Sequence, residues 1–207
     1  MTKFTSFFCC SVLLMLSCNQ TENSKFDISV AFNETVSPEN KDGRLLLMLS
    51  TDDSKEPRFQ INDGLNTQLI FGMNVDNMAP GASISFDESI FGYPYPSLKE
   101  VPPGEYNVQA LLHVYETFNL STGHTVKLPM DNGEGQHWNT SPGNLYSKPF
   151  KIAVGENGID KVSVVMDQII PPIPEPEDTE WIKHIKIKSE KLSEFYVRDI
   201  YLGAHVL

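Results

Sequence analysis

The stretch Val101-Pro102-Pro103-Gly104-Glu105-Tyr106, continued without a break to Phe118, decides the fold of this chain. Proline fixes φ and glycine tolerates turn conformations, so the opening residues predict a tight change of chain direction. The residues that follow alternate with the period of two that is typical of a β-strand. One parity is apolar apart from one phenol, and it consists of Tyr106, Val108, Ala110, Leu112 and Val114. The stretch therefore predicts a long strand with one face in a core and the other face half covered.

Shorter runs predict further strands along the chain, at residues 26–32, 44–50, 67–75, 83–87, 125–130, 150–154 and 159–166. Gly155-Glu156-Asn157-Gly158 predicts the turn of a terminal hairpin between the last two of them. Prolines exclude residues 91–96 from a central strand, and no window holds a helical period without Gly or Pro. The sequence thus predicts an all-β fold, with an antiparallel β-sandwich at residues 26–170. The Pro-Gly-x-Tyr entry into the long strand is typical of immunoglobulin-like and fibronectin-like modules.

Charge and cysteine content exclude several classes of function. The formal net charge is −11, so the chain has no electrostatic footprint for nucleic acid. All three cysteines, Cys9, Cys10 and Cys18, precede the predicted fold, which leaves no disulfide framework and no thiolate metal site. The five histidines lack the spacing of a metal-binding helix, and no Gly-x-Ser-x-Gly, phosphate-binding or dinucleotide-binding motif is present. The residues predict no catalytic group, metal or cofactor.

The N-terminus has the layout of a secretory signal. Lys3 precedes an apolar run, Phe4–Leu16, that is shorter than the roughly 20 residues of a membrane span. Met15-Leu16-Ser17-Cys18 resembles the lipobox of bacterial lipoproteins, which implies that Cys18 carries the lipid. We expect a signal peptide at 1–17, a lipidated tether at 18–25, and anchorage on the outer-membrane or periplasmic side of a Gram-negative cell envelope. The alternative is an ordinary signal peptide with a coincidental cysteine.

One long loop, Asp131–Asn144, could carry a function. It offers two carboxylates, an imidazole, an indole and three glycines, and loops of this length are often functional. The candidate contact residues, for a ligand or for a second domain, are Asp131, Glu134, His137 and Trp138. The competing interpretation is a surface loop whose Trp138 covers the edge of the sandwich, and for ligand binding the residues favour this one.

The C-terminal part begins with a stiff, acidic, polyproline-like spacer at residues 171–180. Trp181–Lys188 then alternates in polarity, and Ile200–Leu207 is an apolar, strand-like run. Two strands cannot bury a core by themselves. We therefore expect residues 181–207 either to pair with the sandwich or to begin a second, incomplete domain.

The mature chain resembles the N-terminal part of a group of secreted bacterial esterases that have an α/β-hydrolase catalytic domain. The residues that carry the resemblance are Gly123–Val126, Met130-Asp131, Glu134–Gln136, Ser141–Ser147, Ile170–Pro172, Asp178–Ile187 and Ile200–Ala204. The resemblance implies that residues 181–207 lead into the hydrolase sheet and that the catalytic serine lies beyond Leu207. It carries no catalytic residue over to this chain.

Three hypotheses about function follow. The leading one is a non-catalytic β-sandwich portion of an esterase-like lipoprotein, which supports or positions a hydrolase domain in cis or in trans. The second is a free-standing cell-surface binding module for a glycan or a protein, using the Asp131–Asn144 loop. The third, which the missing motifs disfavour, is an enzyme with a site of unrecognised pattern.

Overall fold

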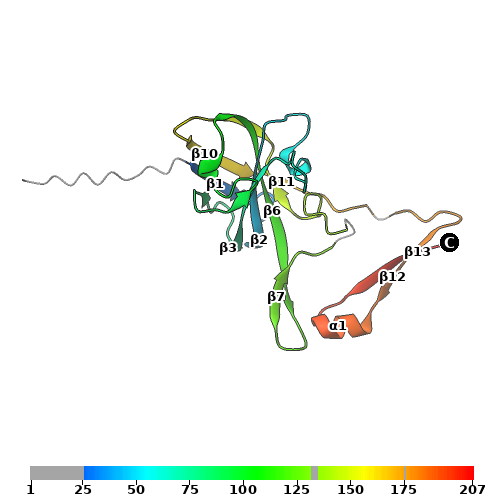
Figure 1. Ribbon diagram of the computed structural model, residues 1–207. Helices are drawn as coiled ribbons and strands as arrows, with labels where there is room; N and C mark the ends of the chain where they lie inside the picture. The colour runs from blue at the N-terminus through cyan, green and yellow to red at the C-terminus, as the bar shows by residue number, and fades with distance from the viewer. Residues whose placement is uncertain (1–25, 132–134, 175) are drawn as a thin grey trace, which may run out of the picture.

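Figure 1 shows the computed structural model, which describes residues 26–131, 135–174 and 176–207. The predicted signal peptide and tether, with Cys18, lie outside the described residues, and so does Glu134. Of the described residues, 47% are in strands and 7% in helices. The prediction of a mostly β protein with antiparallel sheets is confirmed.

The smaller sheet has three strands in the order β10 (Ile159–Met166), β1 (Phe26–Phe32) and β4 (Ile84–Phe86). Strand β1 pairs antiparallel with β4 but parallel with β10. Every second residue of β1 is buried, because successive side chains of a strand point to opposite faces of the sheet. One face of this sheet therefore lies against the core.

The larger sheet is organised around β6 (Gly104–Asn119), the strand that the opening stretch predicts. It pairs antiparallel with β2 (Lys41–Ser50) over Asn107–Tyr115. The sheet order is β11 (Gln168–Ile169), β8 (Leu145–Tyr146), β6, β2, β3 (Leu69–Met78) and β5 (Gly92–Tyr93). Strands β7 (Thr125–Leu128) and β9 (Phe150–Val154) pair with the two ends of β6.

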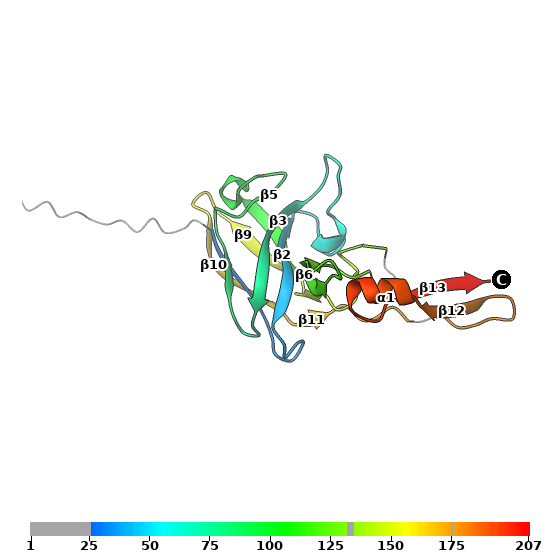
Figure 2. The same ribbon diagram turned by 90° about the horizontal axis from the view of Figure 1, so that it is seen from below.

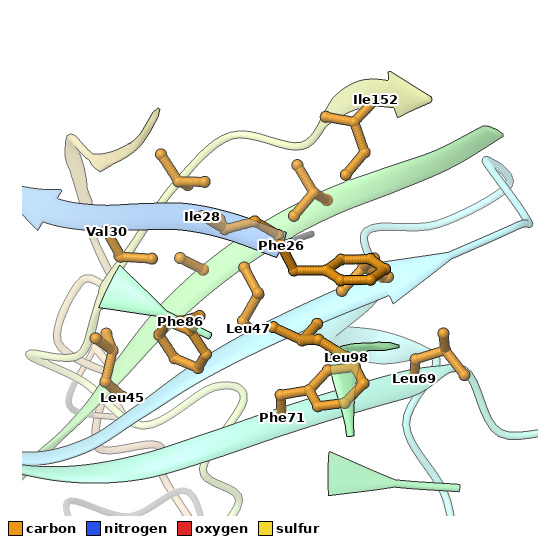
Figure 3. Packing of buried hydrophobic residues seen from close by; sticks show 14 of the residues in the cluster. Phe26, Ile28, Val30, Leu45, Leu47, Leu69, Phe71, Phe86, Leu98 and Ile152 are labelled. Carbon is orange, nitrogen blue, oxygen red and sulfur yellow. The ribbon is translucent and has the colours of Figure 1, made fainter. Parts of the chain in front are cut away.

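The main core lies between the two sheets. Alternate residues of β2, among them Leu45 and Leu47, pack in one cluster with Ile28, Val30 and Phe86 of the smaller sheet, as Figure 3 shows. Each of these side chains is fully buried, and each contributes about 1.5–3 kcal/mol to stability through the area that it removes from water.

The other face of the larger sheet is covered as well. Leu46 and Met48 of β2 and Leu111 of β6 form a second buried cluster with Ile170. In a strand that is covered on both faces, neither set of alternate residues needs to be polar. This explains the unbroken apolar run at Leu45–Leu49. The covering segments come from 3-10 helix η1 (Pro57–Phe59) and its flanks and from the loop that contains Trp138.

The predicted terminal hairpin is wrong in its pairing. The bounds of β9 and β10 agree with the predicted strands, but β9 pairs with β6 and β10 pairs with β1. The connecting turn holds only a bridge between Gly155 and Gly158. This turn therefore carries the chain from the larger sheet to the smaller sheet, which lies on the other side of the core.

The C-terminal unit consists of β12 (Lys183–Lys188), α1 (Glu190–Tyr196) and β13 (Tyr201–Val206). The two strands pair antiparallel only with each other, and no described residue after Ile170 is buried. Figures 1 and 2 show α1 beside the β6–β7 hairpin, with the strand pair pointing away from the two sheets. Helix α1 was not predicted; the Ser189 hydroxyl caps it by accepting a hydrogen bond from the Leu192 amide.

Candidate functional site

The structure places Trp138 against the second buried cluster. Its half-buried side chain packs with that cluster of Leu46, Met48, Leu111 and Ile170, and its carbonyl accepts a hydrogen bond from Asn144 Nδ2 at 2.7 Å. An indole held on a sheet face covers apolar area rather than offering a free stacking platform. In this position the indole covers part of the second buried cluster.

The other described candidate contact residues, Asp131 and His137, form hydrogen bonds within the loop itself. Asp131 is exposed, and its Oδ1 accepts a hydrogen bond from the Gly135 amide at 3.2 Å. His137 is also exposed, and its carbonyl accepts the Thr140 amide at 2.9 Å within a turn. Glu134 lies outside the described residues.

The end of the loop completes the hydrogen bonding of β6. Asn144 is 1% exposed, and its Oδ1 accepts the amide of Val114 at 2.9 Å. Ser147 is equally enclosed, and its Oγ accepts the amide of Ala110 at 3.0 Å. The two side chains stand on either side of the short pairing between β8 and β6, and each satisfies a β6 amide where no strand does.

Arg58 anchors the middle of the loop, and sequence reasoning missed it. The residue is 9% exposed; its Nε donates to Glu56 at 2.8 Å and its Nη1 donates to the carbonyl of Asn139 at 3.1 Å. The guanidinium lies over the rings of Phe59 and Tyr146, at 4.5 and 4.2 Å from their centroids. Nothing in the sequence marks this arginine except Pro57, which starts the 3-10 turn that positions it.

Gln109 of β6 was also missed, because a polar residue in a strand pattern predicts exposure. It is fully buried, and its Nε2 donates to Glu56 Oε2 at 2.8 Å and to the Ser147 carbonyl at 2.9 Å. Its Oε1 accepts the Arg58 amide at 3.0 Å. Each polar atom of this amide has a partner, so the network holds the covering segments to the sheet.

A cavity of about 370 Å³ opens between the β1–β2 connection and the two ends of the loop, lined among others by Ser37, Lys41, Glu116, Met130 and Ser141. Its two charged groups are already engaged. Lys41 Nζ lies 3.4 Å from Glu39 Oε2, and Glu116 is paired with Arg198. Both charged groups that line the cavity therefore have an ion-pair partner.

Two histidines that are distant in sequence meet in the C-terminal unit. His184 and His205 face each other across β12 and β13, with ring centroids 4.4 Å apart, and Asp178 Oδ1 lies 3.3 Å from His184 Nδ1. The His184 backbone amide holds the pKa of the Asp178 carboxyl below its usual value. Within the described ranges no group of three or more His, Cys, Asp or Glu could hold a metal ion.

The C-terminal unit touches the rest of the protein through Arg198, just after α1. The Arg198 guanidinium is paired with Glu116, contacts Met130 Sδ at 3.0 Å and lies 4.3 Å from the ring centroid of Phe118. All three partners belong to β6 or to the segment after β7. This contact was not predicted, because nothing in the sequence pairs an arginine near the C-terminus with the hairpin.

In the part of the chain that the structure describes, no helix is long and apolar enough to cross a membrane. Comparison of the chain with protein-family models, with curated proteins and with solved structures gives no match.

Proposed function

We propose that this chain is the non-catalytic N-terminal β-sandwich portion of an esterase-like lipoprotein, and that it positions a hydrolase domain supplied in cis or in trans. The observation that carries the proposal is the C-terminal unit. Its strand pair is a separate sheet of two strands that leaves its apolar side chains in solvent, next to a well-packed scaffold. Such a sheet lacks the third strand or covering layer that independent stability requires.

The exposed apolar surface of the C-terminal unit supports the proposal, because a partner layer would cover it. Trp181 is 74% exposed, Ile187 58% and Leu202 54%, on a unit in which no described residue is buried. Strand β12 carries three lysines, which protect a sheet edge from further pairing, whereas β13 has no charged residue. A partner strand would therefore add beside β13, and a partner layer would cover the apolar face.

We propose further that residues 26–170 form an immunoglobulin-like or fibronectin-like sandwich. Two features support this. The hydroxyl of Tyr106, at the start of β6, donates a hydrogen bond to the carbonyl of Pro102 at 2.9 Å, which is the geometry of a tyrosine corner. Burial raises the pKa of the Tyr106 phenol, so the hydroxyl stays protonated and remains a donor. The second feature is a core enclosed between two sheets, with strands that follow one another in sequence placed in different sheets.

The Asp131–Asn144 loop has a structural role in this proposal. Its indole and the Asn144 side chain contact the larger sheet, and its Asn139 carbonyl accepts a hydrogen bond from Arg58 of η1. The loop follows Met130, which lies at the contact with the C-terminal unit. The lipid on Cys18 and a place in the cell envelope complete the proposal. They rest on the lipobox-like Met15–Cys18 alone.

The test combines an activity assay with the neighbouring DNA. We expect the purified chain to hydrolyse p-nitrophenyl esters no faster than buffer, and the reading frame in or next to this gene to encode an α/β-hydrolase with a Gly-x-Ser-x-Gly motif. Turnover by the chain would contradict the non-catalytic role. Glycan binding that Trp138→Ala abolishes, with no hydrolase encoded nearby, would replace the proposal by a binding module.

A further inference from the structure

The contact between the C-terminal unit and the β6–β7 hairpin joins two parts of the chain that are otherwise connected by the proline-rich segment 171–180. Within the described residues this contact consists of a backbone hydrogen bond, the ion pair of Arg198 with Glu116, and an aromatic pair. The Ser121 amide, in the turn of the hairpin, donates to the carbonyl of Phe195 in α1 at 2.8 Å. Phe118 and Tyr196 meet edge to face, with their ring centroids 5.7 Å apart.

Arg198 sits at the centre of this contact. Its guanidinium reaches a carboxylate, a thioether and an aromatic face at once, through Glu116, Met130 and Phe118. Phe118 is 5% exposed although it lies near the end of β6, because the arginine and Tyr196 cover it. Arginine suits this position better than lysine, since its planar fork can donate to an acceptor while its face stacks on a ring.

Two details make the contact directional. Val197 adopts the left-handed conformation, with φ of 55°, which ends α1 and turns the chain so that Arg198 faces the hairpin. The Arg198 amide then donates to the Ser193 carbonyl at 3.1 Å, which ties the backbone of the arginine to the helix. The orientation of α1 and the position of the guanidinium are therefore coupled.

The hydrogen-bonding capacity of the Arg198 guanidinium is not fully used. Arg198 Nε is buried, and among the described residues no hydrogen-bond partner lies within reach of it. A buried donor without an acceptor destabilises the state that buries it. A contact with this defect, joined to a unit that buries none of its described residues, opens more easily than the core of the sandwich.

We propose that the surface formed by Glu116, Phe118 and Met130 is the docking site by which the sandwich orients the C-terminal unit, with Arg198 as the positioning residue. This inference rests on the proposed function and deepens it: a hydrolase domain that continues from β12 and β13, or that covers them, takes its orientation to the sandwich from this contact while the contact is closed. The partner of the site is the helix-plus-arginine element at residues 190–198 of this same chain.

The backbone amide of Ser121 reports docking directly, because its acceptor belongs to α1. Amide exchange followed by NMR on the full chain should show Ser121 protected, although its residue is exposed. Loss of the charge-assisted bridge in Arg198→Gln should lower that protection roughly tenfold, and Arg198→Lys should restore part of it. The Glu116→Gln, Arg198→Gln double variant should be no worse than Arg198→Gln alone, since both remove one interaction.

The chain provides matched controls. Lys188→Gln removes another ion pair of the C-terminal unit, in which Lys188 Nζ lies 2.7 Å from Asp199 Oδ1. It should leave the exchange rate of the Ser121 amide unchanged. The Gly123 amide bonds within its own turn, and the Ala110 amide bonds to Ser147 in the sandwich, so both should keep their exchange rates in every variant. An unprotected Ser121 in the unaltered chain, or equal loss in Lys188→Gln and Arg198→Gln, would overturn the inference. Either result would leave the proposed function standing without its docking site, because no hydrolase takes part in the measurement.

Discussion

The side chain of Asn144 replaces a strand at the edge of β6, and its removal should destabilise the protein measurably. In Asn144→Ala two partly buried backbone groups lose their partners, the Val114 amide and the Trp138 carbonyl. An unsatisfied buried polar group costs about 1–3 kcal/mol, so we expect a loss of about 2–4 kcal/mol in the free energy of unfolding. For a domain of this size that loss lowers Tm by roughly 5–15 °C.

The assay is thermal and urea unfolding followed by circular dichroism, with an exposed asparagine as the control. Asn119→Ala removes the acceptor of the Thr125 hydroxyl, 2.8 Å away on the surface, and should change stability by no more than about 0.5 kcal/mol. Asn144→Asp keeps the acceptor for the Val114 amide but buries a charge and loses the donor to Trp138, so it should also destabilise. If Asn144→Ala were as stable as Asn119→Ala, the loop would not be part of the sheet's cover, and the structural role argued for Trp138 would fall with it.

Three further predictions concern the scaffold and its anchor. Gly43→Ala should lower the free energy of unfolding by about 1–3 kcal/mol, because the added Cβ would lie 2.2 Å from the His113 carbonyl oxygen on the paired strand. In the control, Gly104→Ala, the added Cβ meets no atom closer than 3.6 Å, so stability should hardly change. The Asn77 amide, with Lys127, holds the pKa of Asp42 below its usual value. The ionised Asp42 carboxylate therefore stabilises the fold above the unfolded-state pKa of about 4, and this stabilisation is lost as pH falls through the folded-state pKa. The difference in urea midpoint between the unaltered chain and Asp42→Asn should shrink on acidification, and a constant difference would contradict this. Metabolic labelling with palmitate should mark the protein and fail in Cys18→Ala, and a label that survives the substitution would exclude Cys18 as the lipid site.

The sequence predicted strands well where alternation and turn residues define them. The bounds of β1, β9 and β10 agree with the residues assigned from pattern alone, and β6 extends over the predicted stretch with its apolar parity in the core. Alternation reports which face of a strand is buried, and this property is local to the strand. It does not report the partner strand, and this is why β9 and β10 were wrongly joined as a hairpin.

The covering elements were less predictable, because they depend on contacts between distant residues. Gln109 is buried only because Arg58 and Ser147 supply its partners, from segments 51 and 38 residues away. Helix α1 has a recognisable cap in Ser189 but spans only seven residues, too short for a helical period to stand out. The Arg198 contact joins residues 82 positions apart, and no local pattern marks such a pair.

The proposed function requires that the C-terminal unit receives a hydrolase. The most direct measurement is amine-reactive cross-linking in intact cell envelopes, followed by mass spectrometry, because the lysines of β12 stand at the edge of the two-stranded sheet. We expect cross-links from Lys183 or Lys188 to a polypeptide, or to a continuation of this one, that contains a Gly-x-Ser-x-Gly motif. Cross-links from these lysines only to other copies of this chain or to proteins without a hydrolase motif would contradict it.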